Sequence, residues 1–282
     1  KKGYNIEYFY CSSDSNSLDG VAIPALKAAV VDGTAPHVID PVIPGAYDEI
    51  INLGEYWDEK ELIPYRDEIG YLGEIIKDYF TEAYRYLAEA KITLDHLKLH
   101  TSAIMDLASI HAASDNLLEK LLEKETHRGK TSHERHLFAS AITPEGLVNH
   151  YPSIISDCLN LYFFTGDPGV GKSTLLEKVY QGFRQKGIDI EVYRCAFDPQ
   201  KIDALVIPEK RLALVKVTDY QSFTLSPEQR LNTQFTLGLG HFSSPKAYRE
   251  KSAIRDEYGK FFSTLIGKAV SSIKKAKLTH AK

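Results

Sequence analysis

The stretch GDPGVGKS at residues 166–173 decides the fold that we expect for this chain. It fits the pattern G-x-x-x-x-G-K-[ST], which forms the phosphate-binding loop of many nucleotide-binding proteins. Glycines let the backbone turn with its amide hydrogens facing inward, where side chains would obstruct them. Inward-facing amides and one lysine together hold the negative charge of a polyphosphate. The stretch therefore predicts that the chain binds a nucleoside triphosphate.

The residues on either side of this loop supply the context that such a loop requires. Residues 160–165 are apolar around Leu-Tyr-Phe-Phe, which predicts a short buried strand. Residues 173–186 have apolar positions at helical spacing, and Gly187 follows as a capping glycine. A strand, a glycine loop and an amphipathic helix in this order bring the helix N-terminus to the phosphates. A chance glycine loop is therefore the weaker interpretation.

Each position of the loop has an expected task. Lys172 neutralises the β- and γ-phosphates, the hydroxyl of Ser173 ligates Mg²⁺, and Thr174 contacts the α-phosphate. The predicted cofactors are thus ATP and Mg²⁺. The expected nucleotide-binding residues are Gly166, Asp167, Pro168, Gly169, Val170, Gly171, Lys172, Ser173 and Thr174.

An internal repeat organises the rest of the chain. Eleven of the thirty positions in residues 2–31 are identical to the residue 184 places later. Average residue usage gives about two matches by chance, so the similarity reflects duplication. The matched residues include Cys11 with Cys195, Asp14 with Asp198, and Asp19 with Asp203.

A second match extends the repeat, since residues 90–93 (AKIT) resemble residues 276–279 (AKLT) at an offset of 186. We interpret the chain as two copies of one unit, residues 1–129 and 130–282, with a helical segment at residues 67–124. Subtracting 184 from the position of Lys172 gives −12, which lies before the first residue. We therefore expect the first copy to lack its own phosphate loop here, and both ends to be trimmed.

ATP hydrolysis normally needs an acid at the end of an apolar strand. Asp32 follows the apolar residues 28–31 and suits this task, although an ordinary Asp-Gly turn explains it equally well. The second copy has Lys216 at the same position, with Asp219 three residues later. Asp198 and Asp203 are alternatives to Asp32, and turn or cap chemistry explains them equally well. The expected catalytic residues are Lys172, Asp203 and Asp198, and the expected metal ligands are Ser173 and Asp32.

Two further sets of reactive residues have a simpler explanation. Cys11 and Cys195 are interpreted as buried thiols at strand ends, because no histidine or asparagine arrangement beside them indicates a nucleophile. His96 and His100 are four residues apart on an expected helix. A zinc site needs further ligands, and no second motif supplies them. We expect solvated or core histidines.

The coarse pattern of the chain predicts an α/β fold. Expected strands lie at residues 6–11, 27–31, 135–141, 160–165, 188–195 and 211–217, with a polar loop at residues 12–20. Residues 67–124 predict two or three long helices. Strands that alternate with helices favour a mainly parallel sheet flanked by helices. The predicted class is an α/β P-loop NTPase of two repeated units with helical insertions.

Composition narrows the partners and the compartment. The formal charge of −4 and the pI of about 6.2 argue against a nucleic-acid partner. No apolar run approaches the length of a membrane helix, so no membrane partner is expected. Three cysteines give no disulfide framework, which predicts a cytoplasmic protein. The expected partners are a nucleoside triphosphate and the packing of the two repeats against each other, and a homo-oligomer is compatible with the sequence.

The phosphate loop and four segments, residues 11–14, 17–21, 31–37 and 135–138, carry a resemblance that spans most of the chain. The chain resembles an uncharacterised bacterial family with two tandem P-loop domains, described only as ATPases or ATP-binding proteins. The resemblance implies ATP binding and one further P-loop upstream in the full-length protein, but no known substrate. It gives a functional label to the loop positions and to Asp32, whereas Lys216 departs from the pattern that hydrolysis requires.

Three functions follow from these observations. The leading hypothesis is a Mg²⁺-dependent ATPase in which the two copies pack as a pseudo-dimer and nucleotide moves the helical segments. The second is a small-molecule or nucleotide kinase, in which a loop acid serves as base for an acceptor hydroxyl. The arginines are scattered along the chain and form no cluster that could make the arginine-rich lid of a kinase, which weighs against this hypothesis. The third is a non-enzymatic switch that binds nucleotide only to set its conformation.

Overall fold

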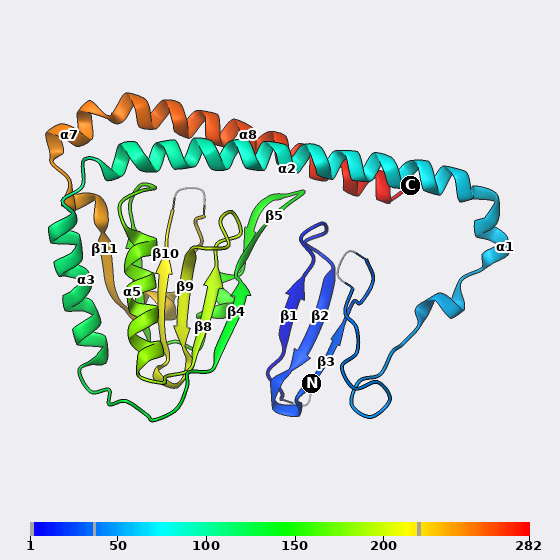
Figure 1. Ribbon diagram of the computed structural model, residues 1–282, viewed down its shortest axis with the longest axis horizontal. Helices are drawn as coiled ribbons and strands as arrows, with labels where there is room; N and C mark the ends of the chain where they lie inside the picture. The colour runs from blue at the N-terminus through cyan, green and yellow to red at the C-terminus, as the bar shows by residue number, and fades with distance from the viewer. Residues whose placement is uncertain (1–2, 36–37, 219–220) are drawn as a thin grey trace. The chain divides into compact units, whose positions relative to one another are not determined.

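The structure is a computed structural model of the 282-residue chain and describes residues 3–35, 38–218 and 221–282. The chain forms two compact units, which are described separately (Figure 1). Unit 1 comprises Lys1–Ala83, Thr143–Glu145 and Val270–Lys282, and unit 2 comprises Tyr84–Ile142 and Gly146–Ala269. This division differs from the repeat boundary at residues 129/130. Two long helices, α2 (Arg66–Ser102) and α8 (Ser252–His280), contribute residues to both units.

Unit 2 is built on a six-stranded sheet in the order β11-β7-β10-β9-β8-β4. The central strand β7 pairs in parallel with both β10 and β11, and β4 pairs in parallel with β8. Within this sheet β9 alone runs antiparallel, between β8 and β10. The architecture is therefore α/β with a mostly parallel sheet. The strands are β4 (Glu134–Phe138), β7 (Asn160–Thr165), β8 (Ile190–Arg194), β9 (Ile202–Ile207), β10 (Leu212–Lys216) and β11 (Thr233–Gly238).

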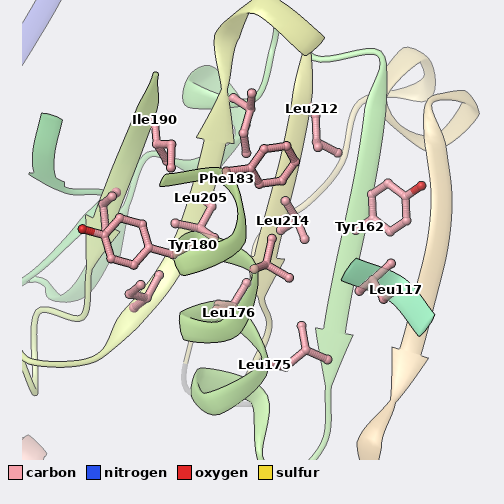
Figure 2. Close-up of a cluster of buried hydrophobic side chains, with 14 of the residues drawn as sticks. Leu117, Tyr162, Leu175, Leu176, Tyr180, Phe183, Ile190, Leu205, Leu212 and Leu214 are labelled. Carbon is pink, nitrogen blue, oxygen red and sulfur yellow. The ribbon is translucent and has the colours of Figure 1, made fainter. Parts of the chain in front are cut away.

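One face of this sheet is covered by α5 (Lys172–Gln185) and α3 (Leu107–Leu122). Figure 2 shows Leu175, Leu176 and Phe183 of α5 turned toward the strands, where all three are fully buried. Burial of each such side chain stabilises the fold by about 1.5–3 kcal/mol. The first turn of α5 is thereby held at the end of β7.

The opposite face carries a second apolar cluster. Tyr151 of α4 (Tyr151–Ile154) and the following Ile155 pack there with Phe163 and Val215. Because the sheet is buried on both faces, β7 is an apolar run rather than an alternating one. A separate two-stranded hairpin is formed by β5 (Ser140–Thr143) and β6 (Gly146–Asn149).

Unit 1 contains a three-stranded antiparallel sheet of β1 (Glu7–Tyr10), β2 (Leu18–Ile23) and β3 (Ala28–Val31). Its register repeats that of β8, β9 and β10 strand for strand. The irregularity between Phe9 and Tyr10 recurs 184 residues later, between Tyr193 and Arg194. The backbone therefore follows the duplication seen in the sequence.

The turn before the last strand of each set repeats as well. Lys27 and Arg211, again 184 positions apart, both adopt the left-handed backbone, with φ of 51° and 46°. In each case the residue's N–H donates to a proline carbonyl three positions earlier, that of Pro24 or Pro208, at 3.0 Å. Non-glycine residues seldom adopt this conformation, so its recurrence is a specific feature of the repeated unit.

The two long helices pair within each unit. In unit 2, Phe262 of α8 packs among Ala90, Leu94 and Leu97 of α2. In unit 1, Ser272 of α8 donates a hydrogen bond to Glu82 of α2 at 2.8 Å. Later residues of α8 thus meet earlier residues of α2, which is antiparallel packing. The remaining helices are α1 (Glu59–Leu62), α6 (Pro227–Leu231) and α7 (Pro245–Glu250).

Most of the predicted elements are confirmed, but the strands β2, β6, β9 and β11 were not predicted. Residues 160–165 form a strand, α5 begins one residue before its predicted start, and residues 67–124 contain the two helices α2 and α3. The predicted loop at residues 12–20 is wrong at its end, because β2 begins at Leu18. Its counterpart β9 was also not predicted. In both strands an aspartate, Asp19 or Asp203, interrupts the apolar pattern.

No helix within the described residues has the combination of length and hydropathy that crossing a membrane requires.

Candidate functional site

The glycine loop at residues 166–171 connects the end of β7 to the start of α5. Gly166, Gly169 and Gly171 have φ angles of 120°, 96° and 98°. Side chains rarely adopt these angles, so glycine is required for this path of the backbone. A buried parallel strand, a left-handed glycine turn and a helix N-terminus together form the arrangement that the motif predicts.

The loop is closely surrounded by other elements of unit 2. A Cβ atom on Gly169 would lie 2.5 Å from the carbonyl oxygen of Lys98 on α2. A Cβ on Gly171 would lie 3.3 Å from Ile110 of α3, and one on Gly166 would lie 3.2 Å from the backbone nitrogen of Gly240. Glycine therefore serves both the backbone conformation and the close approach of the neighbouring segments.

The ammonium group of Lys172 lies inside the loop. It donates to the carbonyl oxygens of Gly166 and Asp167, the latter at 2.8 Å, and the residue is 4% exposed. The loop carbonyls thus hold the cation next to the backbone that the motif assigns to phosphate. An anionic ligand can compete for this ammonium, because a charge-assisted bond to phosphate is stronger than a bond to a neutral carbonyl.

Asp167 ties the loop to the C-terminal helices. Its carboxylate accepts a hydrogen bond from the Tyr248 hydroxyl at 2.6 Å and lies 3.1 Å from Nε of Arg255. The Arg255 guanidinium also stacks on the Tyr248 ring, 3.7 Å from its centroid. The Arg255 guanidinium thus provides the charge opposite to that of the Asp167 carboxylate. Sequence reasoning missed both partners, since no motif surrounds them.

A cavity of about 720 Å³ opens beside the first three turns of α5. Ser173 and Thr174 line it, together with one carboxylate, Glu177, and three cations, Lys178, Arg194 and Lys201. Its volume falls within the range of small-molecule and cofactor sites. Two hydroxyls and an excess of positive over negative side chains near a helix N-terminus suit a polyphosphate with its magnesium ion.

The position expected to hold an acid is filled by an ion pair. Lys216, the last residue of β10, lies beside Phe164 of β7 in the register of the sheet. Its ammonium pairs with the carboxylate of Asp203, which is 1% exposed. Asp203 also accepts a hydrogen bond from Gln221 at 3.2 Å. The expected catalytic acid Asp203 is thus buried and neutralised by Lys216. Asp219 lies outside the described residues.

The other two predicted acids have partners of their own. Asp198 lies 3.3 Å from the ammonium of Lys91 on α2. Asp32 belongs to unit 1, whereas the glycine loop belongs to unit 2. There its carboxylate accepts bonds from the N–H and hydroxyl of Thr34 at 2.9 and 2.7 Å, as in an Asp-Gly turn.

The remaining reactive residues are not gathered at the loop. Cys195 is buried, and burial raises the pKa of its thiol, with the nearby Asp203 adding to the shift. His96 and His100 both lie against the ring of Tyr258. In the described part of the chain, no three histidine, cysteine or acidic residues are grouped as a metal site would require.

Comparison of the chain with known protein families, curated proteins and solved structures finds no match. The resemblance to a family with tandem P-loops stays a prediction. A function must therefore be argued from the glycine loop and the residues that surround it.

Proposed function

We propose that this chain binds a nucleoside triphosphate, ATP with Mg²⁺, at residues 166–174. The observation that supports the proposal best is the path of the loop. Three glycines with left-handed backbone join a buried parallel strand to the N-terminus of α5, and Lys172 reaches back into the turn. The backbone N–H groups of the loop and the ammonium of Lys172 then face the same point, which favours the binding of a polyphosphate there.

Each residue of the loop has a separate role in binding the nucleotide. Lys172 exchanges its bonds to the loop carbonyls for bonds to the β- and γ-phosphates. Ser173 supplies a hydroxyl to the Mg²⁺ ion that accompanies the nucleotide, and Thr174 contacts the α-phosphate. Arg194 and Lys201 line the adjoining cavity and add positive charge where the phosphates enter.

The proposed reaction is slow, Mg²⁺-dependent ATP hydrolysis coupled to the two long helices. Coupling is supported by two contacts of the loop, from Gly169 to Lys98 of α2 and from Asp167 to Arg255 of α8. A nucleotide that changes the loop must change one or both contacts. The two copies then work as a pseudo-dimer, because α2 belongs to the first copy while the loop belongs to the second.

A non-enzymatic switch is the second candidate, and one observation favours it. Lys216 stands where an acid is expected, and it neutralises Asp203, so neither residue is suited to hold magnesium. Nucleotide binding would then set the positions of the helices without turnover. Transfer to an acceptor, as in a kinase, is the third candidate and requires a second bound molecule.

Isothermal titration with Mg²⁺-ATP tests the proposal. Lys172→Ala should weaken binding by about ten- to a hundredfold, the effect of losing a charge-assisted bond. Lys186→Ala, which removes a lysine just after the last residue of the same helix, serves as the matched control and should bind normally. Equal affinity of both variants and the parent chain would exclude the loop as the nucleotide site.

Turnover measurements separate the three candidate reactions. Phosphate release above background from Mg²⁺-ATP supports the ATPase, and its absence with intact binding supports the switch. Consumption of ATP that depends on an added acceptor supports the kinase.

A further inference from the structure

Unit 2 contains a second cavity, of about 240 Å³, at the edge of the sheet where the parallel strands end. Cys195 follows β8 and Asp203 lies near the start of the antiparallel strand β9, so both reach this edge. In open α/β sheets ligands bind outside the carboxyl ends of the parallel strands. The cavity thus lies where this architecture holds small molecules.

The floor of the cavity is polar and buried. Asp203 and Gln221 are 1% and 2% exposed, and Ser140 is also buried. The side-chain nitrogen of Gln221 lies within hydrogen-bond distance of three acceptors: Asp203 Oδ2 at 3.2 Å, Ser140 Oγ at 3.2 Å and Tyr151 Oη at 2.7 Å. An amide nitrogen has two hydrogens, so it cannot serve all three acceptors at once. The floor therefore has spare acceptor capacity, which a ligand with a hydrogen-bond donor can use.

The walls of the cavity are apolar. Ile142 and Leu147 come from the β5–β6 hairpin, and Phe262 and Ile266 come from α8. The ring of Phe197 meets that of Phe262 edge to face, with 5.4 Å between centroids. Such walls favour an aliphatic or aromatic body and exclude water from the polar floor.

The charge on the floor restricts the ligand further. Asp203 is paired with Lys216, so the floor carries no net charge from this pair. A charged ligand group would lose its hydration without gaining a counter-ion, which is unfavourable. A hydroxyl fits, since it can donate its hydrogen to the floor acceptor that Gln221 leaves unserved. The volume is below the usual 300–1,000 Å³ of ligand pockets, which limits the body to about one ring or a short chain.

We propose that this cavity binds a small neutral alcohol or phenol, with its hydroxyl on the floor formed by Ser140, Asp203 and Gln221. The site does not depend on the proposed nucleotide site, and it can be tested without nucleotide.

Three probes of similar shape test the site on the full chain: benzyl alcohol, toluene and benzoate. Binding is followed by the rate at which methyl methanethiosulfonate modifies Cys195, which lines the cavity, in a Cys11→Ser background. Benzyl alcohol should slow this modification and bind about fivefold more tightly than toluene, the effect of one added hydrogen bond. Benzoate should bind more weakly than benzyl alcohol.

Variants in the walls and the floor of the cavity test whether the probe binds inside it. Leu147→Trp fills the cavity and should abolish protection, whereas Leu278→Trp, on an exposed part of α8, should leave it unchanged. If Leu147→Trp does not fold, Ser140→Ala keeps the test open, since it should reduce the preference for benzyl alcohol over toluene. Equal binding of toluene and benzyl alcohol, tighter binding of benzoate, or no protection of Cys195 would each overturn the proposal.

Discussion

The ion pair between Lys216 and Asp203 gives the sharpest prediction about stability. Their side chains are 8% and 1% exposed, so neither charge has water as an alternative partner. Removing one member of a buried pair typically costs about 3–5 kcal/mol, because the other charge stays buried without its counter-ion. We expect Lys216→Met and Asp203→Asn each to lower the free energy of unfolding of unit 2 by about this amount.

A double-mutant cycle separates the pair from the general cost of mutation. The double variant Lys216→Met/Asp203→Asn should be destabilised by less than the sum of the single variants, with a coupling of at least about 2 kcal/mol. Guanidinium unfolding monitored at several wavelengths measures this, with the slope of the transition compared between variants. The exposed pair Glu74 and Lys77, at 3.9 Å, is the control and should couple by less than about 1 kcal/mol. Additive costs at Lys216 and Asp203 would refute the reasoning.

Three further predictions follow from single contacts. Gly169→Ala should destabilise unit 2 by more than about 1–2 kcal/mol in thermal unfolding. Alanine is strained in the left-handed backbone conformation of this position, and its Cβ would collide with the Lys98 carbonyl. An unchanged melting temperature would argue against the contact. The pKa of Asp14 is lowered to about 2, mainly by the hydrogen bond from Lys277. The stability from this carboxylate is therefore present above about pH 4 and lost as the pH falls toward 2, so Asp14→Asn should flatten the acid limb of a pH–stability curve. Burial raises the pKa of the Cys195 thiol, so its alkylation at pH 8 should be slower than that of a cysteine peptide, and fast alkylation would show that it is accessible.

The part of the site that the sequence predicted is the part made by neighbouring residues. The strand at residues 160–165, the loop and the helix after it follow one another without a break, and each carries its own local pattern. Apolar periodicity defines the strand and the helix, and glycine defines the turn. Their contacts need no information from distant segments, so the loop and the cation of Lys172 could be predicted together.

The residues that the sequence could not predict come from far along the chain. Lys98 lies about 70 residues before the loop, and Tyr248 and Arg255 lie about 80 residues after it. Each is a polar residue on a helix. Such residues also occur on any solvent-exposed helix face, so the sequence pattern does not single them out. The pairing of Lys216 with Asp203 is of this kind as well, since it depends on an antiparallel strand that was not predicted.

The recurrence of Asp14 and Asp198 in the two copies is better explained by helix docking than by catalysis. Asp198 lies 3.3 Å from the ammonium of Lys91, and Asp14 lies 2.9 Å from that of Lys277. The two aspartates are 184 residues apart and the two lysines are 186 apart, so both partners belong to the repeat. In each pair the aspartate of one copy meets the lysine on the helix of the other copy. Catalysis by an aspartate would not require a lysine from the opposite copy at the matching position. If the long helix of each copy packs against the other copy, however, the same aspartate–lysine pair is expected in both places.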